Sequence, residues 1–161
     1  MDIGINVTTP SHVEIALGDN RGNEILLSYG VWEELINQRD NIGCFFTNDV
    51  IEAPSQTIGH IKLSFGTINN LKVLRLETST QCLIMSSNTV YNMISHEYCV
   101  HYIAQSLKNI IGTVDAKFTR FREIANGAVK NPIAAIRESE FFDKDNIVNC
   151  ELLAQVFVLQ Y

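Results

Sequence analysis

The chain has 161 residues, with 12 Lys and Arg against 18 Asp and Glu and therefore a formal net charge of −6. Hydrophobic residues make up 46% and charged residues 19%, which excludes a disordered tail, and the length suffices for one hydrophobic core. Met1 is followed by Asp2 rather than by a basic and then an apolar segment, and apolar runs stay far below the roughly 18 residues of a membrane span. We therefore expect an intracellular protein, nuclear or cytoplasmic, without membrane contact.

Period-two alternation of apolar residues dominates the chain up to about Met85 and predicts antiparallel strands. The clearest case is residues 60–65, where Ile61, Leu63 and Phe65 share one face. Residues 18–23 and 69–70 are rich in Gly, Asn and Asp, which is typical of hairpin turns. We predict an α+β fold, with antiparallel sheets in the N-terminal half, a helix after each strand unit and a helical C-terminal third.

Two helices are expected within the first two thirds of the chain. Ser28 is the predicted cap of the first helix, and Gly43 is its predicted end. Residues 44–46 and 50–51 then resemble short strands. Ser87 is the predicted cap of a longer helix that runs to about Ile111 and ends at Gly112.

These two stretches match each other at a constant spacing of 59 residues. Each stretch has a strand residue, a Ser cap, an aromatic residue and an apolar helix face at matching positions. For example, Ser28 matches Ser87 and Trp32 matches Tyr91. We expect a single compact domain over residues 1–161, with a possible internal duplication of 1–43 and 44–112 and a helical extension at 113–161. The alternative is that any strand followed by a Ser-capped amphipathic helix matches this well.

The last third of the chain has helical spacing of apolar residues. Asn131 followed by Pro132 predicts a helix start, with Asn as the cap and Pro in the first turn. Residues 156–161 could form either a helix or a strand.

The residues that could carry catalysis form no recognisable catalytic motif. His96, Cys99 and His101 could bind a metal or form a Cys–His pair, but a buried position in a largely apolar helix is the favoured interpretation. Glu33, Glu34 and Asp40 are expected on a solvated helix face. We therefore expect no enzyme, no cofactor and no metal.

Positive charge is concentrated between Lys108 and Arg137, where six basic residues stand against two acidic ones. Within this stretch Lys117, Arg120 and Arg122 alternate with aromatic residues, a combination that can bind phosphates and stack on bases. A second candidate surface is the outer face of the middle strands, with Lys62 and Arg75. The alternative for the first stretch is a buried aromatic face flanked by solvated cations.

The chain contains two units, each made of strands followed by a helix. In the first unit Leu27-Ser28 precedes a Trp-bearing helix, and in the second Ser86-Ser87 precedes a Tyr-bearing helix. Together they resemble the positive-cofactor-four type of single-strand DNA-binding fold. The doubled arrangement is similar to the Whirly family. The resemblance implies sheets that carry single-stranded DNA on one face and helices that mediate oligomer formation.

Two functions follow from these observations as competing expectations. The first is a non-catalytic single-stranded nucleic-acid-binding protein that acts as a homo-oligomer, such as a viral or replication accessory factor. The second is a protein-interaction or assembly module without nucleic-acid binding, which the net charge of −6 favours. Self-association, most simply as a dimer, is expected in both cases because the chain has two apolar stripes on one helix and sheet edges that need cover.

Overall fold

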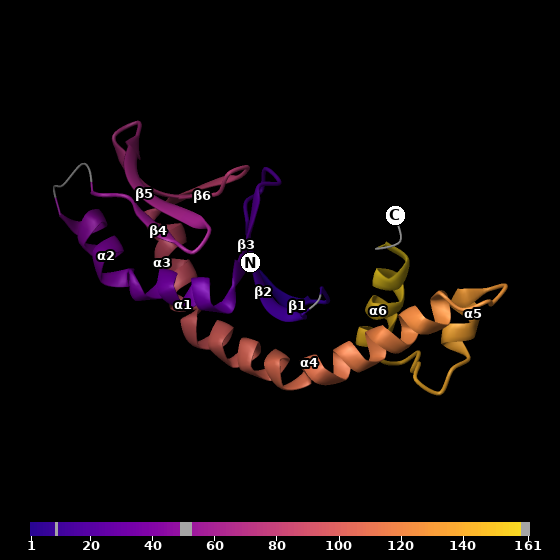
Figure 1. Cartoon of the computed structure of the whole chain (residues 1–161). Helices are drawn as coiled ribbons and strands as arrows, with labels where there is room; N and C mark the ends of the chain where they lie inside the picture. The colour runs from indigo at the N-terminus through magenta and orange to yellow at the C-terminus, as the bar shows by residue number, and fades with distance from the viewer. Residues whose placement is uncertain (9, 49–52, 159–161) are drawn as a thin grey trace. The chain divides into compact units, whose positions relative to one another are not determined.

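The computed structural model describes residues 1–8, 10–48 and 53–158 (Figure 1). The strands form two antiparallel sheets, one of order β1-β2-β3 and one of order β4-β5-β6-β7. Their bounds are β1 (Asp2–Asn6), β2 (His12–Gly18), β3 (Glu24–Ser28), β4 (Gln56–Ile58), β5 (Ile61–Ile68), β6 (Leu71–Glu77) and β7 (Cys82–Ser86). The helices are α1 (Tyr29–Asn37), α2 (Arg39–Thr47), α3 (Ser87–Ser95), α4 (Glu97–Ala125), α5 (Pro132–Arg137) and α6 (Ile147–Val158). The predicted α+β class is confirmed.

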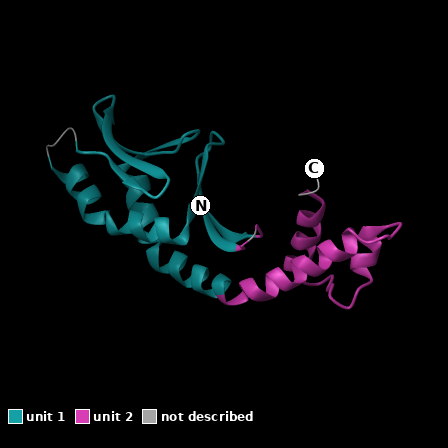
Figure 2. Cartoon of the chain, viewed as in Figure 1, with its two compact units in different colours: residues 1–6, 12–108 teal, residues 7–11, 109–161 magenta. Residues whose placement is uncertain are grey.

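The chain divides into two compact units (Figure 2). Unit 1 comprises residues 1–6 and 12–108 and holds both sheets, and unit 2 comprises residues 7–11 and 109–161. Helix α4 contributes its first part to unit 1 and its second part to unit 2. A single compact domain over the whole chain stays a prediction.

Each sheet of unit 1 buries one face, as the alternation of apolar residues predicts. In the first sheet Ile15 lies opposite Leu27, and both are fully buried. In the second sheet Leu63 lies opposite Leu76, and both are again fully buried. The turn between β5 and β6 is formed by Asn69 and Asn70, which both have positive φ, as a tight hairpin requires.

The two strand–helix segments of unit 1 match in detail at a spacing of 58 residues. Ser28 and Ser86 cap α1 and α3 with extended backbones, φ −68° with ψ 157° and φ −72° with ψ 166°. Both helices have 9 residues and end at a residue of the same conformation, Gln38 with φ −82° and ψ 4° and His96 with φ −85° and ψ 4°. A second helix then starts at Arg39 and at Glu97, which are 58 residues apart.

The spacing of 59 residues and the Ser87 cap are therefore wrong by one residue. The Ser86 hydroxyl accepts a hydrogen bond from the Thr89 N–H at 3.4 Å, whereas Ser87 is the first residue of α3. A cap needs a non-helical backbone, which the first of the two adjacent serines provides. At a spacing of 58 the strands β3 and β7 have identical alternation of exposed and buried residues.

Three further boundaries differ from the sequence-based expectation. Gly43 does not end a helix but lies within α2, and Cys44–Phe46 is helical rather than a strand. Ile42 and Phe45 are buried on one face of α2, and this burial outweighs the cost of roughly 1 kcal/mol for a helical Gly. Gly112 likewise lies within α4. Residues 50–51 lie outside the described residues.

Unit 2 is helical, as predicted for this part of the chain. Its core contains Val114, Phe118 and Phe121 from α4 together with Ile136 from α5 and apolar residues of α6. Asn131 caps α5 as expected, because its side chain accepts a hydrogen bond from the Ala134 N–H at 3.1 Å. Residues 156–161 were expected to be either helix or strand. The part up to Val158 is helical, and residues 159–161 lie outside the described residues.

The position of the second cap can be tested by two neighbouring substitutions. We expect Ser86→Ala to lower the free energy of unfolding by about 1 kcal/mol, because the Thr89 N–H loses its acceptor. Ser87→Ala should change it by less than about 0.5 kcal/mol. Urea denaturation followed by circular dichroism measures both values, and a larger loss in Ser87→Ala would contradict the assignment.

Candidate functional site

The outer face of the second sheet holds two of the five predicted binding residues. Lys62 and Arg75 alternate with the buried Leu63 and Leu76, so they point away from the core of unit 1. Lys62 is exposed, but it lies directly opposite Glu77 in the β5–β6 register. Arg75 is half-buried, and its Nε is buried without a hydrogen-bond partner among the described residues.

A shallow hollow of about 470 Å³ borders this face and includes Lys62, Glu77 and Cys82. Burial raises the pKa of the Cys82 thiol, and the Glu77 carboxylate raises it further. A raised pKa lowers the thiolate fraction, so this cysteine is a poor nucleophile. The hollow combines one cation with one carboxylate and presents no concentrated positive charge.

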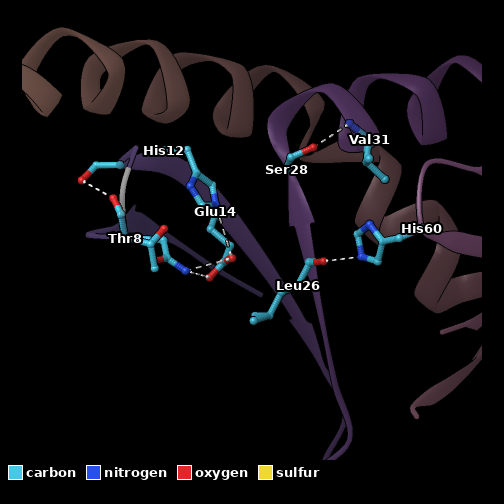
Figure 3. Close-up of polar contacts among 9 residues, drawn as sticks. Thr8, His12, Glu14, Leu26, Ser28, Val31 and His60 are labelled. Carbon is cyan, nitrogen blue, oxygen red and sulfur yellow. Dashed lines mark hydrogen bonds and ion pairs between the residues drawn. The ribbon is translucent and has the colours of Figure 1, made fainter. Parts of the chain in front are cut away.

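The corresponding face of the first sheet carries acidic residues in place of cations. Glu14 and Glu24 alternate with the buried residues of β2 and β3, and Asp2 alternates with the half-buried Ile3 and Ile5 of β1. Glu14 lies 3.7 Å from Nε2 of His12 and accepts hydrogen bonds from the Asn6 amide at 3.2 and 3.3 Å (Figure 3). A polyanion that crossed both sheets would therefore meet carboxylates on one of them.

His60 contacts the edge of the first sheet. Its Nε2 lies 2.9 Å from the carbonyl oxygen of Leu26 on β3 (Figure 3). The contact occupies one backbone acceptor of an edge strand, which otherwise offers a place for another strand to add. His60 therefore links the sheets of unit 1.

The other three predicted binding residues lie on the part of α4 that belongs to unit 2, and each is engaged within that unit. Lys117 donates a hydrogen bond to the buried Asn149 at 2.9 Å. Arg120 pairs with Glu123 at 2.8 Å and lies 5.1 Å from the centre of the Phe141 ring. Arg122 lies 5.9 Å from the centre of the Phe118 ring. Phe118 and Phe121 are buried, which confirms the alternative of an aromatic core face flanked by cations.

These three cations do not form one surface. Residues two positions apart on a helix do not face each other, so Arg120 and Arg122 point to different sides of α4. Lys62 and Arg75 belong to unit 1. Of the five predicted binding residues, Lys62 and Arg75 lie together on one face of the second sheet.

The His96, Cys99 and His101 cluster does not converge, and its predicted burial is wrong. All three residues are exposed. His96 Nδ1 contacts the Asn92 carbonyl oxygen at 2.6 Å, while His101 Nδ1 contacts the Tyr29 hydroxyl. In the described part of the chain, no group of three His, Cys, Asp or Glu residues is placed to hold a metal ion. Glu33, Glu34 and Asp40 are exposed, as expected.

A pair of exposed tyrosines on α4 was not predicted as a site. Tyr98 is 82% exposed and Tyr102 is 74% exposed, and they lie one helical turn apart. Val90, Ile94 and Tyr98 recur at helical spacing, which in one continuous helix would put Tyr98 on the same face as the buried Val90. The helix is interrupted at His96, where α3 ends and α4 begins. Residues after His96 therefore do not continue the buried face of α3. We call Tyr98, Tyr102 and the exposed Ile103 the tyrosine face.

A cleft of about 440 Å³ adjoins the tyrosine face and is lined by residues of α1 and of the start of α4. Its lining includes Tyr29, Trp32, Glu33, Glu97, Tyr98 and His101. Glu97 accepts two hydrogen bonds from Arg39, at 2.7 and 3.0 Å. The Lys108 ammonium lies 4.0 Å from the centre of the Tyr29 ring, a cation–π contact. The cleft therefore combines carboxylates with aromatic rings.

Comparison of the chain with protein families, curated proteins and solved structures finds no match. Among the helices that the structure describes, none is both long enough and apolar enough to cross a membrane.

The phenol of Tyr29 gives the cleft a measurable pH dependence. Burial raises its pKa above the ordinary value of 10.0, and the Glu33 carboxylate raises it further. The folded protein holds this proton more tightly than the unfolded chain, so the stabilisation is present below pH 10 and is lost as the pH rises through the folded pKa. We expect wild type to lose stability relative to Tyr29→Phe in this alkaline range, as measured by urea denaturation at several pH values. Tyr102→Phe, which removes an exposed phenol, should follow wild type, and parallel curves for Tyr29→Phe and wild type would contradict the assignment.

Proposed function

We propose that the protein is a non-catalytic protein-interaction module whose binding surface is the tyrosine face of α4. The observation that carries the proposal is the exposure of Tyr98 and Tyr102, at 82% and 74%. Tyrosine is enriched at protein interfaces because its ring contributes a large apolar area while its hydroxyl remains hydrogen-bonded. A pair of such rings on a regular helix is a preformed contact surface.

The matching segments of unit 1 supply an internal comparison. At the spacing of 58 residues, the positions that correspond to Tyr98 and Tyr102 are Asp40 and Cys44 on α2. Both of these residues are also exposed, so the fold itself does not require an aromatic residue at these positions. We include the internal duplication in the proposal, with its two copies shifted to the observed spacing. The aromatic pair is then a property of the second copy alone.

The charges of the chain support the same choice. Phosphate binding needs cations that are available and concentrated. Lys117 is bound to the buried Asn149, the exposed Arg120 pairs with Glu123, the exposed Arg122 lies near the Phe118 ring, and Lys62 lies opposite Glu77. With a net charge of −6 as well, the protein has little to offer a polyanion.

Single-stranded nucleic-acid binding is the second candidate, and one observation favours it. Lys62 and Arg75 share the outer face of the second sheet, which is the face that the resemblance to the positive-cofactor-four type implies. The exposed apolar residues that share this face by alternation are aliphatic rather than aromatic: Ile68, Leu71 and Ile84. Any such binding would therefore depend mainly on a small number of phosphate contacts.

The proposed interaction surface can be tested with a photo-reactive amino acid placed at position 98 or, as a matched control, at position 40. Both positions are exposed and correspond to each other in the two matching segments. We expect irradiation of cells that produce the protein with this amino acid to give specific protein adducts at position 98 and few at position 40. Adducts of equal yield at both positions, or none at position 98, would refute the module. An adduct of twice the chain mass would identify a homo-oligomer as the partner.

Nucleic-acid binding is tested by fluorescence anisotropy with labelled single strands. The second candidate predicts binding whose log–log salt slope becomes flatter by about 0.7 in Lys62→Ala, since one phosphate contact is lost. Arg21→Ala removes one exposed cation from the β2–β3 hairpin and serves as the control. The double variant Arg120→Ala with Arg122→Ala tests the stretch on α4. Our proposal predicts no single-strand binding by wild type even at about 50 mM salt.

A further inference from the structure

We infer that the cleft beside the tyrosine face takes an arginine-bearing segment of a protein partner. This inference rests on the proposed function and names the chemistry of the partner. Tyr98 belongs to both features, because it lies on the tyrosine face and lines the cleft of about 440 Å³. A segment that contacts the tyrosines therefore places its next side chains in the cleft.

The carboxylates of the cleft select a cation. Glu33 is exposed on α1, and Glu97 comes from the start of α4. Glu97 is already bound by both terminal nitrogens of Arg39. Glu33 lies beside the Tyr29 phenol and, with two oxygens, can accept further hydrogen bonds. Since acidic residues outnumber basic ones in unit 1, the surrounding charge also attracts cations and repels phosphates.

Two cations of the chain itself contact residues that line the cleft, and they illustrate how such residues bind positive charge. Arg39 is held by a bidentate carboxylate contact, and Lys108 lies over the ring of Tyr29. The exposed ring of Tyr98 and the carboxylate of Glu33 offer the same two chemistries to a third cation. Arginine suits both better than lysine, because its planar guanidinium stacks on an aromatic ring while it hydrogen-bonds in a fork to a carboxylate.

A partner of different sequence is favoured over a second copy of the chain. The basic and aromatic stretch of the chain, Lys117 to Arg122, is the obvious internal source of such a segment. Its cations are engaged with Asn149, Glu123 and Phe118, and its aromatic residues are buried. Docking this stretch into the cleft of another copy would break those contacts, whereas an exposed arginine of another protein has none to lose.

The test uses a fluorescein-labelled nonapeptide with three arginines in a Gly-Ser background, titrated against the full-length protein by anisotropy. Matched peptides carry lysine or glutamate in place of arginine. We expect the arginine peptide to bind at least about 3-fold more tightly than the lysine peptide, and the glutamate peptide not to bind. Tyr98→Ala should weaken arginine-peptide binding by about 3- to 30-fold, the range of a partly desolvated cation–π contact.

Two glutamates on α1 provide the decisive control. Glu33→Gln and Glu34→Gln change the net charge equally, and both residues are exposed, but only Glu33 lines the cleft. We expect Glu33→Gln to weaken binding by about 3- to 10-fold and Glu34→Gln to weaken it by less than 2-fold. Circular dichroism of each variant checks that the fold is kept.

Several outcomes would overturn the inference. Equal effects of Glu33→Gln and Glu34→Gln would show general charge attraction only. Displacement of the peptide by a single-stranded oligonucleotide would assign the site to nucleic acid, and self-association that is lost in Tyr98→Ala would assign it to a second copy. If the photo-reactive residue at position 98 gives protein adducts but no arginine peptide binds, the interaction module stands and this partner chemistry fails.

Discussion

The apolar face of each small sheet in unit 1 needs cover that its own strands cannot supply, and helices provide it: α1 contacts β2 and β3 of the first sheet, and α3 contacts β6 and β7 of the second. Phe45 and Phe46 of α2 pack on Phe65 and Tyr91 of the second segment, at ring distances of 4.8 and 6.1 Å. In return, α4 contacts Tyr29 of the first segment through His101 and Lys108. The Arg39–Glu97 pair joins positions that correspond in the two matching segments. This pair is partly exposed, so it contributes at most about 1 kcal/mol.

Local patterns predicted the strands well because alternation and turn chemistry act over a few residues. The buried faces of β3 and β5 and the Asn69-Asn70 turn follow directly from the residues present. Helix boundaries in unit 1 could not be predicted in the same way. Gly43 stays helical because Ile42 and Phe45 are buried against neighbours that are distant in the sequence. A choice between adjacent serines depends on a single backbone conformation, which the sequence does not specify.

The candidate sites show the same division between local and tertiary information. Sequence composition counts cations, but it does not show which are available. Lys117 is engaged with Asn149, 32 residues away, and Lys72 donates hydrogen bonds to backbone carbonyls of Phe45 and Asn48. The tyrosine face was hidden for a related reason. Helical periodicity assumes a continuous helix, and the break at His96 moves Tyr98 out of the buried stripe.

The matching segments of unit 1 separate what the fold needs from what function adds. Positions with a structural task keep their character in both copies, as the capping serines Ser28 and Ser86 show. Asp40 and Tyr98 occupy corresponding exposed positions and have no packing task in common, yet one is a carboxylate and the other a large ring. Exposed tyrosines add apolar surface to a protein and contribute little to its core. Under the proposed function, a partner that binds the second segment accounts for this difference, and the carboxylates beside Tyr98 select a partner of positive charge.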